Sequence, residues 1–231
     1  MTFLIDSFKS AILLLWSLDK DLLIIVSLSL KVSFLSTLIS GICGVPLGLA
    51  ISLNEFRGKR IAITVLNTLL SLPTVVIGLF VYSFISRRGL LGSMGLLYTP
   101  KAMIIGQVIL ILPIITSLTI TALSRIDVRY RKTALTLGAN PFQTAFVILR
   151  EARFGILASI IVAFGRVIAE VGISMMLGGN ARGFTRTMTT AMALEFDKGE
   201  FTMSVALGIV LLLISLAVNV VFNYFQGKTG D

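Results

Sequence analysis

The sequence predicts an all-α integral membrane protein with about five transmembrane helices, an N-terminal interfacial helix and one short helix in a basic loop. Of the 231 residues, 56% are hydrophobic and 13% are charged, which leaves too few charges to cover a soluble domain. The chain also contains five apolar segments, each 22 to 25 residues long. About 20 residues at a rise of roughly 1.5 Å per residue span the hydrocarbon core.

These segments form one predicted transmembrane domain, residues 1–231, with its core at about 22–225. Only the segment that begins at Phe154 contains charged residues, Arg166 and Glu170. The first three each contain a proline, which removes a backbone hydrogen bond and favours a kink. The segments are Val32–Leu53, Ile61–Ile85, Ala102–Leu123, Phe154–Gly178 and Phe201–Phe225.

Residues 3–20 are predicted to form an amphipathic helix at the membrane surface, with Trp16 at the level of the lipid headgroups. The apolar run Ala11–Leu18 is too short to span the membrane. A sixth span over residues 11–30 is the alternative, although the charged residues at 19–21 would be costly inside a membrane.

Small and polar residues recur every three or four positions along the apolar segments. Such stripes face other helices, because small residues permit close approach and polar groups in lipid need partners. Two interpretations stay open: helix packing alone, or a water-filled pathway lined by one or two stripes. The stripe on the first segment is Ser33, Thr37, Gly41, Gly44 and Gly48. The stripe on the second segment is Asn67, Ser71, Thr74 and Gly78.

Arg166 and Glu170 are four residues apart, so they share one face of a helix that crosses the membrane. A charge at mid-membrane is costly, and we therefore expect the pair to face the protein interior or water. One interpretation is an ion pair that its site merely tolerates. The other is an element of a gate or transport pathway, with Asn67 and Ser71 as further candidates.

A basic loop, Arg125–Arg153, lies between the third and fourth segments. After Gly138, Asn140 and Pro141 open a short helix predicted at about Pro141–Phe146, because Asn accepts from free N–H groups of the first turn and Pro has none to leave unpaired. An ordered loop outside the membrane gains a protein little unless something docks there, so we interpret it as a docking surface. Placing it in the cytoplasm puts ten Lys and Arg residues inside and eight outside, in weak agreement with the positive-inside rule.

The loop between the fourth and fifth segments, residues 178–196, combines arginines with glycines and hydroxyl side chains. Guanidinium, hydroxyl and backbone N–H groups are the donors that a tetrahedral oxyanion needs. A threonine near 187–190 also suits the N-cap of a helix over Ala191–Phe196. The loop is a solvated connection, a contact for an external binding protein or an anion vestibule. The candidate contacts are Arg182, Thr185, Arg186 and Thr187.

Composition argues against an enzyme. The chain has no histidine, which excludes His-ligated metal sites and His general bases, and we expect no metal. One cysteine excludes an internal disulfide. The tail GKT at 227–229 lacks the first glycine of a phosphate-binding loop. No nucleophile and base accompany one another, so no residue is predicted to be catalytic.

The basic loop with its glycine, and the stretches GRVIAEVG and TRT, resemble the permease subunits of bacterial ATP-binding-cassette (ABC) importers of the molybdate, tungstate and sulfate branch. The similarity runs from SLKVSFLST at 29–37 through SRRGLLG at 86–92 to TRT at 185–187. Ala134, Gly138 and Ile148 match the family's loop motif. Lys132 replaces its glutamate and Arg150-Glu151 replace its closing Leu-Pro, so a salt bridge of that glutamate is not carried over.

The resemblance implies a cytoplasmic coupling helix that docks on a separate ATPase subunit, which would hold ATP and Mg²⁺ while this chain binds no cofactor. It also implies a second copy of this chain, an extracytoplasmic oxyanion-binding protein, no nucleic acid, and a multi-pass location in a bacterial or archaeal cell membrane. The docking residues would be Ala134, Gly138, Ala139, Asn140, Pro141 and Phe142.

The stretch AEVGISMMLGGN, followed by RGFTRTMTTAMALE, looks most like tungstate-type permeases, and tungstate is therefore the predicted substrate. Molybdate has nearly the same size and charge, so molybdate and, after it, sulfate or thiosulfate are alternatives. A self-contained secondary transporter is a further alternative of another class. Such transporters usually contain inverted repeats, and none is seen in this sequence.

Overall fold

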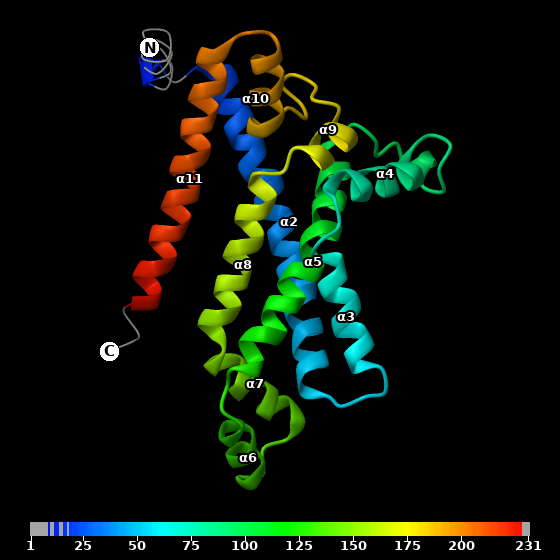
Figure 1. Ribbon diagram of the computed structural model, residues 1–231, viewed down its shortest axis with the longest axis vertical. Helices are drawn as coiled ribbons and strands as arrows, with labels where there is room; N and C mark the ends of the chain where they lie inside the picture. The colour runs from blue at the N-terminus through cyan, green and yellow to red at the C-terminus, as the bar shows by residue number, and fades with distance from the viewer. Residues whose placement is uncertain (1–8, 10–11, 14–15, 18, 228–231) are drawn as a thin grey trace.

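The computed structural model consists of helices joined by loops, and it describes residues 9, 12–13, 16–17 and 19–227 (Figure 1). No β-strand occurs in these residues. The elements are α2 (Lys20–Leu53), α3 (Lys59–Leu69), α4 (Thr74–Ile85), the 3-10 helix η1 (Gly92–Met94), α5 (Pro100–Ser124), α6 (Val128–Thr136), α7 (Pro141–Glu151), α8 (Arg153–Ile168), α9 (Gly172–Gly178), α10 (Met188–Asp197) and α11 (Phe201–Gly227).

Three of these helices, α2, α5 and α11, are long and apolar enough to cross a membrane alone. Two bent pairs, α3 with α4 and α8 with α9, each meet the same test when they are taken together. The described part of the chain therefore supports up to five spans, in agreement with the all-α membrane fold that the sequence predicts.

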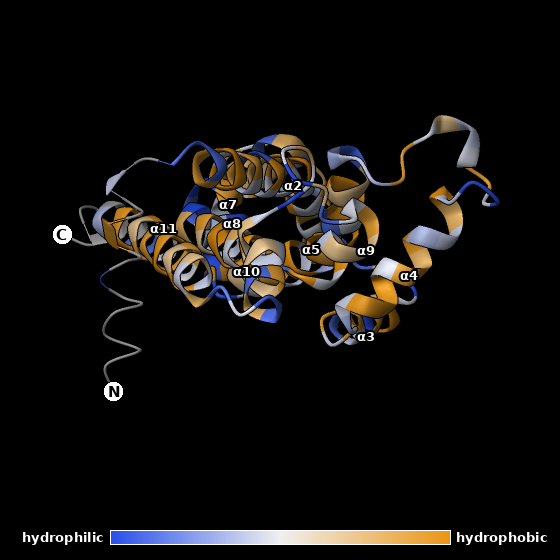
Figure 2. Cartoon of the chain, turned by 90° about the horizontal axis from the view of Figure 1, so that it is seen from above, coloured by the Kyte–Doolittle hydropathy of each residue, from blue (hydrophilic) through white to orange (hydrophobic). Residues whose placement is uncertain are grey.

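The centre of the bundle is the pair α2 and α5, with α8 packed against both (Figure 1). Gly48 of α2 lies so close to α5 that an added Cβ would be 2.8 Å from the Cβ of Thr119. In the same interface the buried hydroxyl of Ser36 donates to Gln107 Oε1 at 2.9 Å. The stripe predicted on the first segment thus faces another helix. Seen along the bundle, α3 and α4 lie at one edge and α11 at the opposite edge (Figure 2).

The first span begins earlier than predicted. We expected it to start at Val32, after a charged residue, but α2 begins at Lys20 and continues through Lys31, which stays on the exposed side. Asp19 caps the helix by accepting from the Leu22 N–H at 3.1 Å. A charge on an exposed face does not end a helix, and the cap sets the start instead.

The N-terminal alternatives can be judged in part. A separate sixth span over residues 11–30 is wrong, because residues 20–30 are the first turns of α2. The interfacial helix predicted over residues 3–20 falls largely outside the described residues. Trp16, which the structure does describe, is 87% exposed.

Two predicted spans are broken rather than continuous. The segment Ile61–Ile85 bends by 100° between α3 and α4, where Pro73 occupies the N-cap of α4. The segment Phe154–Gly178 bends by 59° between α8 and α9. Pro46 and Pro113, by contrast, lie inside helices that remain continuous.

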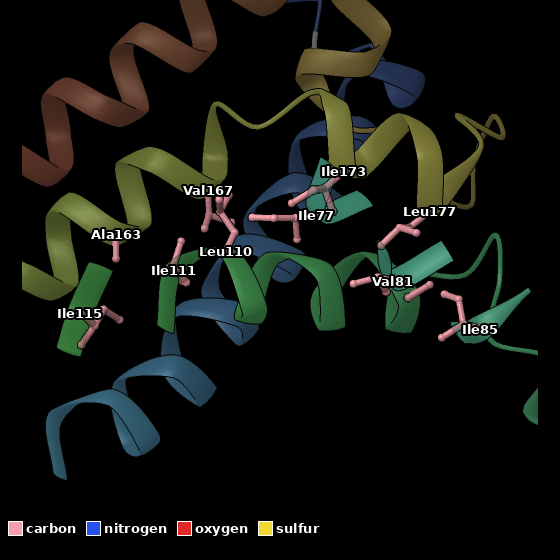
Figure 3. Packing of buried hydrophobic residues seen from close by; sticks show 11 residues of the cluster. Ile77, Val81, Ile85, Leu110, Ile111, Ile115, Ala163, Val167, Ile173 and Leu177 are labelled. Atoms are coloured by element: carbon pink, nitrogen blue, oxygen red, sulfur yellow. The ribbon is translucent and has the colours of Figure 1, made fainter. Parts of the chain in front are cut away.

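A buried apolar cluster holds the bent pairs against α5 (Figure 3). Ile77 and Val81 of α4 pack with Ile173 and Leu177 of α9, and Ile111 of α5 belongs to the same cluster. α4 and α9 are in this way fixed to one another, while their partner helices α3 and α8 each pack against α5 (Figure 1).

The two ends of the bundle differ. The turn between α2 and α3 lies at the same end as α6 and α7, whereas α9, α10 and the start of α2 lie at the opposite end (Figure 1). The sequence predicts this grouping of the loops when each apolar segment crosses the membrane once.

Candidate functional site

The break between α8 and α9 is built around a buried carboxylate. Arg166 Nη1 lies 3.0 Å from Glu170 Oε2, as the four-residue spacing predicts. Glu170 Oε1 accepts from the Ile173 N–H at 3.2 Å, in the first turn of α9. The Glu170 side chain is 2% exposed, so both of its oxygens have a partner in a site that water does not reach freely.

The same break is also held by α10. Thr189 Oγ1 donates to the main-chain oxygen of Glu170 at 2.8 Å, and the Met188 N–H donates to Ser29 Oγ of α2, also at 2.8 Å. The carbonyl that the break leaves without a helical donor is therefore paired. Sequence reasoning identified Arg166 and Glu170 but missed these two contacts, which join residues far apart in the chain.

Arg166 is only partly covered. Its side chain is 43% exposed, and a Cβ added at the neighbouring Gly165 would meet no atom within 4 Å. The guanidinium is thus bound to Glu170 through Nη1 while part of the side chain stays exposed. The arrangement can present positive charge beside a bend in the helix. It has no nucleophile and no base for a reaction on a substrate.

In the loop between α9 and α10, two of the four predicted contacts are bound within the loop itself. Thr185 Oγ1 donates to the Gly178 carbonyl at 2.6 Å and accepts from the Ala181 N–H at 2.9 Å. Thr187 is the N-cap of α10 and forms a capping box with Thr190. This cap is the one predicted for a threonine at 187–190, and the helix it starts runs from Met188 to Asp197.

The two arginines of this loop face carboxylates. Arg182 forms an ion pair with Asp21 of α2, and this hydrogen bond raises the pKa of the guanidinium. Arg186 Nη1 lies 3.9 Å from Glu195 Oε1, which also binds Lys198. A cavity of about 580 Å³ lies among them. Its charges are balanced, which the sequence did not indicate because Asp21 is so distant in the chain.

Asn67 and Ser71, the remaining pathway candidates, are both exposed, Asn67 on α3 and Ser71 in the turn between α3 and α4. Asn67 Oδ1 accepts from Ser117 Oγ of α5 at 2.9 Å, which ties the two helices. The other two members of the predicted stripe are on α4, beyond the 100° bend, and Gly78 there is buried against Met176. The break therefore divides this stripe into an exposed and a packed half.

The basic loop folds into a helical hairpin, α6 and α7. Gly138 adopts a φ of +81°, the left-handed region that favours glycine. Asn140 caps α7 by accepting from the Gln143 N–H at 2.8 Å, and the Gln143 side chain accepts from the Asn140 N–H. Asn140 and Pro141 act as predicted. The reciprocal contact of Gln143 was missed. The predicted helix end at Phe146 was wrong, since α7 runs on to Glu151.

Two large apolar side chains of the hairpin are left in solvent. Phe142 is 82% exposed and Leu137 is 81% exposed. Between α6 and α7 lies a cavity of about 480 Å³ that includes Tyr130, Ala134 and Leu137 in its lining. Of the predicted docking residues, Ala134 is 8% exposed, so it packs the hairpin instead of facing outward. Exposed apolar residues on an ordered hairpin are typical of an interaction surface.

Residues 44–230 match the family model described as binding-protein-dependent transport system inner membrane component. The chain is 39% identical to the tungstate uptake system permease protein TupB of Peptoclostridium acidaminophilum, over 98% of this chain and 99% of that protein. It is 37% identical to TupB of Campylobacter jejuni, over 95% and 92%. A solved bacterial ABC transporter for import of the acidic polysaccharide alginate has a TM-score of 0.78 at 17% identity, over 98% of this chain and 84% of that chain, which shows the fold alone.

The helix bundle and these similarities define a transport permease, a multi-pass protein of the cell membrane. More narrowly, the chain belongs to the family of binding-protein-dependent transport system inner membrane components, as its sequence resemblance to ABC importer permeases predicts.

Proposed function

We propose that this chain is the membrane-spanning permease subunit of an ATP-driven importer of tungstate. The similarity to two tungstate uptake permeases over nearly the whole chain carries the proposal. The fold provides the parts that such a subunit needs: spans that cross the membrane, and an ordered hairpin outside them. ATP and Mg²⁺ bind to a separate subunit, and this chain is not an enzyme.

In this proposal the α6–α7 hairpin lies in the cytoplasm and docks on the ATPase. Phe142 and Leu137 provide the apolar contact, and Gly138 and Asn140 fix the direction in which α7 is presented. Because α7 continues almost directly into α8, with Ala152 between them, movement of the ATPase reaches the Arg166–Glu170 break along a continuous path. Two copies of the chain form the membrane unit.

The opposite end, with α10 and the loop before it, faces an extracytoplasmic binding protein that delivers the oxyanion. Thr185 and Thr187 shape this loop from within, whereas Arg182 and Arg186 stand at its surface cavity in ion pairs. An arriving surface that offers carboxylates or an oxyanion competes with Asp21 and Glu195 for these guanidinium groups.

Reconstitution tests this function. The permease, its ATPase and its binding protein are placed in vesicles, and accumulation of tungstate is measured with and without ATP. We expect uptake that requires all three proteins and is inhibited more strongly by molybdate than by sulfate, because molybdate has nearly the size and charge of tungstate. ATP-independent accumulation by the permease alone would instead support a secondary transporter.

A further inference from the structure

We infer that neutral hydrogen-bond donors on α3 and the last turns of α5 line the route along which the oxyanion passes toward the α6–α7 end. The inference rests on the proposed function and adds to it the residues of the inner half of the pathway. The groups are Thr64, Asn67 and Thr68 on α3, Ser71 in the turn that follows α3, and Ser117, Thr121 and Ser124 on α5.

The first observation is the polar face of α3. Thr64, Asn67 and Thr68 share one face of α3, Ser71 lies two residues past its end, and all four are exposed. No residue of α3 is buried, although α3 is half of a bent pair that meets the test for a membrane span. At that depth lipid offers no hydrogen bonds, so the polar groups here that the helix itself does not satisfy need water or a polar partner against them.

A second polar face lies beside the first. Ser117, Thr121 and Ser124 of α5 are spaced by four and three residues, and Ser117 Oγ donates to Asn67 Oδ1 at 2.9 Å. This hydrogen bond fixes the two faces next to each other. The juxtaposition of two helices gives a surface wide enough for an anion to contact donors from both.

The donors on this surface are free to turn outward. The Asn67 amide N–H groups and the Ser71 hydroxyl have no partner within the described residues. Thr64 and Thr68 donate to carbonyls of their own helix, at 2.9 Å each, and a change of rotamer redirects them. The hydroxyls of Thr64 and Thr68 are therefore satisfied whether or not an anion is present.

Neutral donors suit a pathway better than a cluster of cations would. A conducting site must attract the ion enough to admit it and hold it weakly enough to release it. Along this face of α3 there is no charge after Arg60, which is exposed at the end of the helix nearest the α6–α7 hairpin. An oxyanion leaving the hydroxyl face would thus meet positive charge at the exit.

Thiol labelling tests the route in inside-out membrane vesicles from cells that express the whole transport system. Cys43→Ala removes the native thiol, and Asn67→Cys or Ser71→Cys is then treated with the membrane-impermeant anion 2-sulfonatoethyl methanethiosulfonate. Val65→Cys and Leu66→Cys, off the polar face of the same helix, are the controls. We expect positions 67 and 71 to react about tenfold faster than the controls, because only a thiol in water ionises readily. Equally slow reaction at all four positions would mean that lipid or a second copy covers the face, and it would overturn the inference.

Measuring tungstate uptake into cells tests the role of Asn67 in the pathway separately from the proposed function of the whole protein. Asn67→Leu should lower uptake about tenfold by removing the amide donors, and Asn67→Gln, which keeps them, should recover most of it. Equal loss in both, at normal membrane levels, would mean that Asn67 acts only as a spacer and would overturn its role. Absence of tungstate uptake in the Cys43→Ala parent and the wild type would refute the proposed function itself, whereas the labelling pattern would still report whether the face is open to water.

Discussion

Thr189 donates its hydroxyl to the main-chain carbonyl of Glu170 at 2.8 Å, so the first turn of α10 closes the break between α8 and α9. Both residues are buried, at 7% and 3% exposure. The contact matters because the break would otherwise leave a buried carbonyl without a donor. It also joins the loop at one end of the bundle to the helix that leads to the α6–α7 hairpin.

Replacing Thr189 by Val should remove this contact while nearly preserving the shape of the side chain. Leaving the buried Glu170 carbonyl unpaired should cost about 1–3 kcal/mol, and the midpoint of thermal unfolding in detergent should fall by several degrees. Thr202→Val is the control, because the Thr202 hydroxyl has no hydrogen bond to the described residues. Equal midpoints for Thr189→Val and wild type would show that the carbonyl finds another donor.

Arg166→Ala should leave the buried Glu170 carboxylate without its ion-pair partner. Breaking a buried ion pair from one side costs about 3–5 kcal/mol, and the lower figure applies here because Arg166 is partly exposed. We expect reduced amounts of protein in the membrane or reduced uptake. The double variant Arg166→Gln with Glu170→Gln should recover much of the stability, since no charge is then left alone. Wild-type expression and uptake in Arg166→Ala would place the pair in a well-solvated, unimportant position.

Substitutions at Gly138 test the left-handed backbone conformation of this turn rather than the space around it. An added Cβ there meets no atom within 4 Å, so the cost of substitution comes from the φ of +81°. Gly138→Val should weaken co-purification of the ATPase, because a β-branched residue rarely adopts this conformation, whereas Gly138→Asn should behave nearly as wild type. Similar ATPase recovery from both variants would mean that the turn does not orient α7.

Two glycines of α2 form a matched pair for testing the central helix contact. At Gly48 an added Cβ would lie 2.9 Å from the Thr116 carbonyl oxygen, whereas at Gly41 the nearest atom would be 3.9 Å away, on Ile160. Gly48→Ala should therefore destabilise the protein by about 1–3 kcal/mol, and Gly41→Ala should have little effect. Thermal unfolding in the same detergent compares them, and equal midpoints would contradict the close approach of α2 and α5.

Local features of this fold could be predicted from the sequence. The length of the apolar segments predicts the spans, and the Asn140-Pro141 pair predicts the start of α7, because capping depends on residues within one turn. A threonine cap within 187–190 was predicted for the same reason, and Thr187 is that cap. These features arise from neighbouring residues, whose geometry is nearly independent of the rest of the protein.

Features that depend on distant residues could not be predicted. Arg182 binds Asp21 across 161 positions, and no short pattern joins them. The break after α8 contains neither proline nor glycine, and Gly172 directly after it is needed because a Cβ there would be 3.0 Å from Thr74 Oγ1 of α4. The start of α2 was misjudged since Lys31 was taken as a boundary, although its side chain lies on an exposed face.

The central claim is that a separate ATPase drives transport through the exposed tip of α7. Phe142→Asp places a charge at that tip, and Leu90→Asp is the matched control, since the two side chains are 82% and 84% exposed and Leu90 lies in the loop after α4. Co-purification of the ATPase with each variant is the measurement. The account predicts that Phe142→Asp loses the ATPase while Leu90→Asp retains it, and full retention by Phe142→Asp would contradict the account.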